Sequence, residues 1–184
     1  MHERSAQLLE RQTGAGVGEW SRRIRDTGID SRATLLAWLK ERGINGYAQQ
    51  LLIMERFGYP DYLVASAEEL IYDQYADRPG LRPVLDRVLN IALGLAEPGA
   101  VDVQVRKTYV TLRTRRRKFA VIKASTRKRV DLGLRIDGRQ PGGRLESAKV
   151  LRDGVMTIRI ALGSPEEVDD EVAQWLATSF RENL

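Results

Sequence analysis

Apolar residues in the first third of the chain recur at helical spacing, in short runs that end at glycine. The spacing predicts helices over residues 3–13, 18–27, 31–42 and 47–57, which end at Gly14, Gly28, Gly43 and Gly58. Ser31 is the expected N-cap of the third helix. The predicted inward-facing residues are Leu8, Leu9, Trp20, Ile24, Leu35, Leu36, Trp38, Leu39, Tyr47, Leu51, Leu52 and Met54. We therefore expect a bundle of four helices, whose last helix exposes Gln49, Gln50, Glu55 and Arg56.

A connecting segment follows the predicted bundle. Ser66 and Glu69 have the spacing of a capping box, which predicts a short helix through Tyr75. The run Asp77-Arg78-Pro79-Gly80 then interrupts the chain. Beyond it, apolar residues at intervals of three and four predict an amphipathic helix over residues 80–96. The expected organisation is a helical domain at 1–63, a linker at 64–79 and a second domain at 80–184.

The second domain shows the alternation of β-strands. Strands are predicted at 101–105, 109–112, 119–124, 130–136, 148–151 and 155–162, with Asp153-Gly154 as a hairpin turn between the last two. An antiparallel sheet of five or six strands explains the pattern. Together with the flanking helices, it predicts an α+β fold.

The chain ends in a pattern typical of a helix start. Ser164 is the expected N-cap, Pro165 occupies the first helical position, and the acids from Glu166 to Glu171 suit the positive end of the helix dipole. The helix start explains this acidic cluster better than a pair of catalytic carboxylates does. Val168, Val172, Leu176 and Ser179 or Phe180 form the predicted buried stripe, with Trp175 beside it. Helices 80–96 and 164–182 should cover the same face of the sheet.

Positive charge is concentrated in the predicted sheet. The formal net charge of the chain is +5, but residues 99–164 contain 17 Lys and Arg against 5 Asp and Glu, and the remainder has a net charge of −7. The densest part, residues 105–136, reads as a β-meander in which Arg115-Arg116-Arg117-Lys118 and Arg127-Lys128-Arg129 join apolar strands. Such a segment has a local field that attracts anions.

We interpret the basic meander as a nucleic-acid-binding surface for DNA or RNA. Guanidinium and ammonium groups on hairpin tips can contact phosphates, and a tyrosine can stack on a base. The candidate residues are Arg106, Lys107, Tyr109, Arg113, Arg115, Arg116, Arg117, Lys118, Lys123, Arg127, Lys128 and Arg129.

Three alternative interpretations use the same pattern. Tyr109, Lys123, Arg135 and Arg159 could share one sheet face beneath the loop 138–143 and line a pocket for an anionic small molecule. The basic sheet could instead dock an acidic protein, or the acidic helices of this chain. The charges could also do no more than solvate the outer face of a sheet and protect its edges.

Other classes of function find little support in the sequence. A helix-turn-helix is suggested by the short link 43–46, but the helix after it has little net charge for phosphate, and plain packing explains the link. The chain has no cysteine, and its only histidine, His2, lies beside the N-terminus. The glycines of 14–18 follow a helix, whereas a dinucleotide-binding loop follows a strand. We expect a non-enzymatic protein without cofactor or metal.

The expected environment follows from the same composition. No apolar run approaches the length of a membrane span, and the N-terminus lacks the basic start and apolar core of a signal peptide. We expect a cytoplasmic protein without a membrane partner. A homodimer is left open.

The motifs also support a resemblance to known families. Residues 13–63, with TGAGVGEW (Thr13–Trp20), Trp38-Leu39-Lys40 and Gly46-Tyr47-Ala48, resemble a small bacterial helical domain of unknown function. Residues 72–183, with KTYVTLR, KFAVIK, RVDLGL and SPEEVDDEV, resemble a second domain of unknown function that often follows the first. The order of its elements is distantly similar to the MmcQ/YjbR-like double-wing proteins, a group suggested to bind DNA. The second family often has a histidine where this chain has Ile158, so no function that relies on that imidazole is expected.

Overall fold

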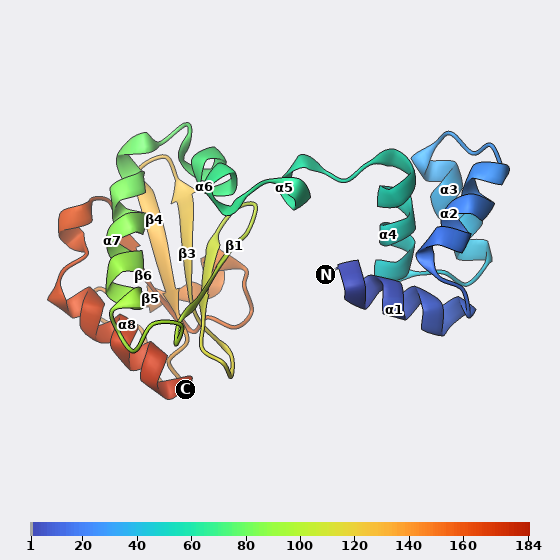
Figure 1. Ribbon diagram of the computed structural model, residues 1–184. Helices are drawn as coiled ribbons and strands as arrows, with labels where there is room; N and C mark the ends of the chain where they lie inside the picture. Colours follow the sequence, from blue (N-terminus) through green and yellow to red (C-terminus); the bar gives the residue numbers. More distant parts are fainter. Residues whose placement is uncertain (1) are drawn as a thin grey trace. The chain divides into compact units, whose positions relative to one another are not determined.

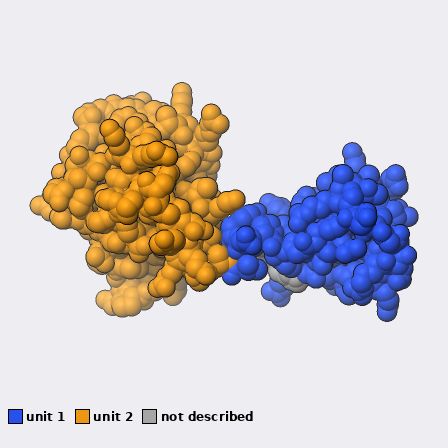
Figure 2. All heavy atoms as spheres, turned by 90° about the horizontal axis from the view of Figure 1, so that it is seen from above, with its two compact units in different colours: residues 1–64 blue, residues 65–184 orange. Residues whose placement is uncertain are grey.

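The computed structural model describes residues 2–184, with side chains from residue 3 onward, so the side chain of His2 lies outside the described part. The chain forms two compact units, Met1–Val64 and Ala65–Leu184 (Figure 2). The first unit is helical. The second contains an antiparallel sheet with helices, which confirms the predicted α+β fold (Figure 1).

Four packed helices and one short helix make up the first unit. They are α1 (His2–Thr13), α2 (Val17–Asp26), α3 (Arg32–Glu41), α4 (Gly46–Phe57) and α5 (Asp61–Val64). The chain leaves α3 through Gly43, whose φ of 75° falls in the left-handed region that glycine adopts without strain. Ser31 caps α3 as predicted, because its hydroxyl accepts a hydrogen bond from Thr34 N. The glycine-punctuated pattern therefore gave the correct helices.

The core of the first unit differs from the prediction at three residues. Leu36 is 41% exposed and Tyr47 is 68% exposed, so neither is a core residue. The helical repeat turns Leu35 and Leu39 inward, and Leu36 then falls on the flank of α3. Gln49, expected on the outside, is buried and donates a hydrogen bond to the carbonyl of Leu36 at 3.0 Å.

The second unit begins with helices and continues into the sheet. Its elements are α6 (Ala67–Tyr75), a 3-10 turn (Pro79–Leu81), α7 (Arg82–Leu93), β1 (Asp102–Val105), β2 (Val110–Arg113), β3 (Lys118–Thr126), β4 (Arg129–Leu134), β5 (Glu146–Ser147), a second 3-10 turn, η2 (Ala148–Leu151), β6 (Ile158–Leu162), a third 3-10 turn (Pro165–Glu167) and α8 (Asp170–Glu182). All neighbouring strands are antiparallel, in the order β1-β2-β3-β4-β6-β5.

One face of the sheet forms the core with α7 and α8. The register aligns Val105, Val110, Ile122, Leu132 and Ile160 across five strands. These residues belong to one hydrophobic cluster with the inward stripes of both helices, which lie on the same side of the sheet (Figure 1). The prediction that both helices cover one face is confirmed.

Residues 148–151 are not a strand. They form η2, and the strand that pairs with β6 is the shorter segment Glu146–Ser147. Leu151 packs onto the face of the sheet over Gly133, which draws this segment away from the sheet edge. Asp153 and Gly154 lie in the long connection between the paired strands β5 and β6, with a bend at Gly154, and do not form the tight hairpin turn that was predicted.

Two helices of the second unit also have boundaries that differ from the prediction. The N-cap of α8 is Asp169, whose carboxylate accepts a hydrogen bond from Val172 N at 3.1 Å. Ser164 instead precedes a separate 3-10 turn. Val168, with a ψ of 71°, is not helical and separates this turn from α8. The amphipathic helix predicted over 80–96 is shorter, with α7 ending at Leu93. The capping box of Ser66 and Glu69 is present as predicted.

Candidate functional site

The face of the sheet away from α7 and α8 is polar and only partly covered. Across six strands the register aligns residues that alternate with the core row, namely Gln104, Thr111, Val121, Gly133, Arg159 and Glu146. The half formed by β4, β6 and β5 lies beneath η2 and the segment that follows it, where Val121, Ala148, Leu151 and Met156 form a small apolar cluster. This cover reaches β3 at Val121, whereas β1 and β2 lie further along the sheet, at the edge away from β5.

Four of the predicted nucleic-acid residues share this face of the sheet on β1, β2 and β3. Strand alternation places Tyr109 and Arg113 on the side of Thr111, and the register extended by one residue sets Tyr109 opposite Lys123. Arg106 joins them, because its amide donates to the carbonyl of Tyr109 and its guanidinium to Gln104 Oε1. The ring of Tyr109 is half-buried against the apolar cluster. We call these four residues, Arg106, Tyr109, Arg113 and Lys123, the basic platform.

The cations of the platform have few competing partners. Lys123 is opposite Asp131 in the register, yet no ion pair joins their side chains, because Asp131 is engaged by arginines. Arg113 likewise makes no ion pair among the described residues. Lys107, in the exposed turn between β1 and β2, flanks the platform. The platform therefore has positive charge available to a ligand.

The arginines at the β2–β3 hairpin mainly hold the end of α8. Arg117 donates to the carbonyl of Glu182 at 3.0 Å and lies 3.8 Å from Asp137, while Arg116 donates to the carbonyl of Leu184 at 3.3 Å. These contacts place positive charge at the negative end of the helix dipole. Lys118 pairs with Asp153 at 2.6 Å. Arg115 alone of this run is exposed without a partner.

The hairpin between β3 and β4 lies at the opposite end of a nine-residue strand, about 30 Å away. Arg127 is 3.7 Å from Asp77, and Arg129 is 3.0 Å from Asp131. Lys128 is exposed and makes no ion pair. The two basic tips are thus separate, and neither joins the platform in one compact cluster.

Arg159 is held in a buried ion network and is not available to a pocket with Tyr109 and Lys123. Arg159 is buried between two acids, with 2.5 Å to Asp131 Oδ1 and 2.5 Å to Glu146 Oε2. Arg135 belongs to a backbone network in which its carbonyl accepts from Asn183 Nδ2 at 2.9 Å. Of the four residues named for the anion pocket, Arg159 therefore belongs to a buried ion network, Tyr109 and Lys123 share one face of the sheet, and Arg135 contacts Ser179 and Asn183 through its backbone.

Three basic residues outside the predicted set surround a hollow beside the platform. Arg139, Lys149 and Arg152 line a depression of about 940 Å³ between the loop 138–141 and the segment 147–157. The turn signals Asp137-Gly138 and Asp153-Gly154 mark both loops in the sequence. Their approach depends on strand order, which the sequence does not show.

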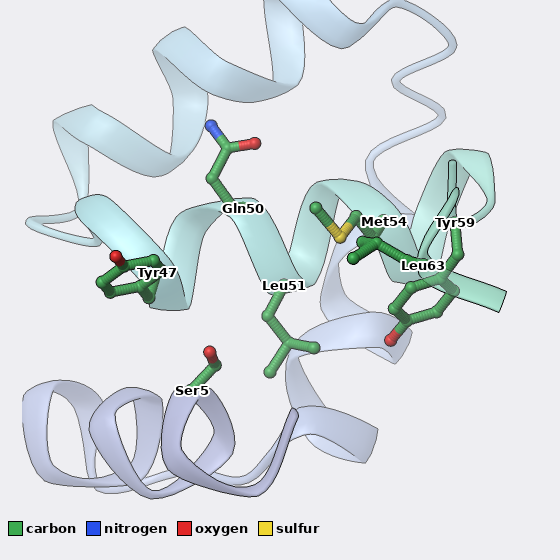
Figure 3. Close-up of a pocket in the computed structure, with 7 residues that line it drawn as sticks. All are labelled: Ser5, Tyr47, Gln50, Leu51, Met54, Tyr59 and Leu63. Carbon is green, nitrogen blue, oxygen red and sulfur yellow. The ribbon is translucent and has the colours of Figure 1, made fainter. Parts of the chain in front are cut away.

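The first unit has a pocket of different character. It measures about 270 Å³ and lies between α1, α4 and the segment around α5 (Figure 3). Leu51 points toward α1 in this view, while Met54, Tyr59 and Leu63 gather at one end. Burial, together with the hydrogen bond that Tyr59 donates to Glu55, raises the pKa of the phenol to about 12. The lining is mainly apolar and fits no phosphate.

A family model matches residues 71–183 and describes a domain of unknown function, DUF5655. The chain belongs to the DUF5655 family. The match covers most of the sheet-bearing unit, including the platform and the hollow, and it agrees with the resemblance of residues 72–183 to a domain of unknown function. No curated protein and no solved structure matches the chain significantly.

The described part of the DUF5655 chain has neither a cluster of metal-ligating side chains nor a helix that could span a membrane. Within residues 3–184, no three His, Cys, Asp or Glu side chains come together in an arrangement that could hold a metal ion. No helix of that part combines the length and the apolar character that a membrane span requires.

Proposed function

We propose that the sheet-bearing unit is a non-enzymatic module that binds single-stranded nucleic acid on the basic platform. One observation carries the proposal: an aromatic ring, Tyr109, shares one face of the sheet with the cations Arg106, Arg113 and Lys123, and the strand register sets Lys123 opposite the ring. Sheet surfaces that bind single strands combine these two elements, because bases stack on rings while cations contact phosphates.

The balance of charge supports an anionic ligand. Four acids of the basic segment, Asp131, Asp137, Glu146 and Asp153, already pair with cations. This leaves cations in excess, and Arg113, Arg115, Lys123 and Lys128 have no acidic partner in the described part of the chain. They are spread along β3 and its hairpins, which suits an extended polyanion better than a compact one. The distant resemblance to MmcQ/YjbR-like double-wing proteins, a group suggested to bind DNA, agrees with this proposal.

The test is titration of a labelled oligothymidylate or oligouridylate of about 12 nucleotides, followed by fluorescence anisotropy. The double variant Arg113→Ala/Lys123→Ala should bind about tenfold more weakly. The dependence of log affinity on log salt should become shallower by about 1.4, since about 0.7 is lost per phosphate contact on a single strand. Arg87→Ala/Arg181→Ala is the matched control, because it removes two exposed charges from the helices that cover the other face. If both double variants bind like wild type, the proposal is wrong.

Tyr109→Leu distinguishes nucleic acid from an acidic protein partner. Loss of base stacking should weaken oligonucleotide binding by about 1–3 kcal/mol while the salt dependence stays unchanged. An acidic protein surface needs the cations but not the ring. The decisive result is a Tyr109→Leu variant with unchanged oligonucleotide affinity and an Arg113→Ala/Lys123→Ala variant with weakened affinity. This result would overturn base stacking and favour docking of an acidic protein.

A further inference from the structure

The hollow lined by Arg139, Lys149 and Arg152 is separate from the basic platform. One wall is the loop 138–141, and the other is η2 with the turn that follows it. Its volume of about 940 Å³ is at the upper end of the range that accommodates small molecules. Met156 also lines it and belongs to the apolar cluster against which Tyr109 packs. The hollow is thus a neighbour of the platform on the same side of the sheet.

Both walls are anchored, so the hollow does not depend on a ligand to form. Leu151 holds η2 against the sheet at Gly133. On the other wall, the guanidinium of Arg139 lies 4.6 Å from the ring centroid of Trp175 on α8. Arg144 fixes the end of the same loop through Asp169 at 2.6 Å. A site on anchored walls loses little conformational entropy when a ligand binds.

The charge of the hollow is unbalanced. Lys149 and Arg152 are exposed and make no ion pair among the described residues, and Arg139 contacts only the face of a ring. The single acid of the lining, Asp153, has a carboxylate engaged by Lys118 at 2.6 Å. Three cations therefore surround a space with no acid free to neutralise them. Two of them are guanidinium groups, whose forked donors match the oxygens of a phosphate.

The backbone of Arg152 provides an independent observation. Its φ of 52° lies in the left-handed region, and it is the one residue other than glycine in the described part of the chain with a positive φ. Glycine or asparagine would adopt this conformation more easily, so an arginine here is unfavourable for folding. Arg152 ends η2 as its C-cap, and residues in such sparsely populated conformations cluster at active sites, ligand clamps and switch regions.

We propose that this hollow binds a small phosphorylated molecule that carries at least two negative charges. The proposal goes beyond nucleic-acid binding at the platform, because it names a different set of residues and a different size of ligand. Arg152 and Lys149 bind the phosphate oxygens from one wall, and Arg139 binds them from the other.

Calorimetric titration of the full chain with pyrophosphate tests the proposal. Arg152→Gly is the sharpest variant, because glycine suits the left-handed backbone and keeps the fold while the guanidinium is lost. It should bind pyrophosphate about tenfold more weakly, and Lys149→Ala should have a similar effect. Thermal unfolding of Arg152→Gly without ligand should occur at the wild-type temperature or above it.

The platform variant separates this site from the proposed function. Arg113→Ala/Lys123→Ala should keep wild-type affinity for pyrophosphate, and Arg152→Gly should keep wild-type affinity for the oligonucleotide. Loss of pyrophosphate binding in the platform variant would place the anion on the platform and overturn the hollow as a site. Wild-type affinity in both Arg152→Gly and Lys149→Ala would do the same. Tighter binding of citrate than of pyrophosphate would overturn the assignment to a phosphate ligand.

Discussion

Leu151 lies over Gly133 so closely that a β-carbon on residue 133 would come within 2.4 Å of Leu151 Cδ1. Gly133 is in β4, in the middle of the sheet, and faces η2. Met156 approaches the same point, with its Cγ 3.0 Å from the added carbon. Glycine in a strand often marks such a close approach of another segment. This contact holds one wall of the hollow against the sheet.

Gly133→Ala should therefore lower the free energy of unfolding by about 1–3 kcal/mol, the usual cost of adding a methyl group to a packed site. Urea denaturation measures the change. Gly142→Ala is the control, because an added β-carbon there would meet no atom within 4 Å and Gly142 has no positive φ. Equal effects of the two substitutions would contradict the role assigned to Leu151.

The buried pair of Asp131 and Arg159 should contribute to stability as a unit. Asp131 is fully buried and the side chain of Arg159 is 7% exposed. Asp131→Ala leaves the buried guanidinium with Glu146 as its one acid, and Arg159→Met leaves the buried carboxylate with only the partly exposed Arg129, so each should cost about 3–5 kcal/mol. The double variant should cost much less than the two together, because neither buried charge then remains without the partner it faced. A double-mutant cycle in urea measures this coupling, and strictly additive costs would show that the pair is not coupled.

Arg115 and Arg117 should behave differently although they are two residues apart. Arg117→Ala removes the hydrogen bond to the carbonyl of Glu182 and should destabilise the protein by about 1 kcal/mol. Arg115→Ala should leave the melting temperature unchanged, because its side chain is exposed and contacts no partner in the described chain. Thermal unfolding of both variants decides the matter. A larger loss in Arg115→Ala would refute this assignment of roles.

The sequence was informative about elements because local patterns set them. Apolar alternation correctly predicted β1 to β4 and β6, and glycine correctly predicted where the first four helices end. The strand prediction was wrong at residues 148–151, whose apolar residues fit a strand as well as they fit the 3-10 conformation that they adopt. Their 3-10 conformation is set by the contact of Leu151 with Gly133, which is distant in sequence. Ser164 failed as the N-cap of α8 because Asp169, further along the same acidic run, took that role.

The candidate site was harder to predict because partners distant in the sequence decide which charges are free. Arg116 and Arg117 contact residues of the C-terminal helix that come more than 60 residues later. Arg159 reaches Asp131 across the pairing of β4 and β6, so its burial depends on strand order. A lone acid in the apolar strand RVDLGL is the signal that could have indicated a buried ion pair. Nothing local distinguishes Lys123, which is free, from Lys118, which is paired.

The stability of the second unit should depend on Tyr75 at high pH. Tyr75 is 3% exposed, and burial raises the pKa of its phenol to about 12, against an ordinary value of 10.0. Because the folded state holds the proton more tightly than the unfolded state, this contribution is fully present below pH 10. It is lost as the pH rises toward 12, and its size is at most about 3 kcal/mol. Urea denaturation of wild type and Tyr75→Phe from pH 8 to pH 11.5 measures the difference.

Tyr75→Phe should equal or slightly exceed wild type in stability at pH 8, because the buried hydroxyl has no hydrogen-bond partner. Above pH 10 the free energy of unfolding of the variant should increase relative to that of wild type, since only the wild type has a phenol to ionise at this position. Titration of lysines and of the other tyrosines affects both proteins alike and cancels in the difference. Tyr72→Phe is the control, because Tyr72 is 70% exposed and its hydroxyl already meets solvent, so this variant should follow wild type at every pH. A Tyr75→Phe curve parallel to wild type from pH 8 to pH 11.5 would show that the phenol ionises equally well in the folded protein.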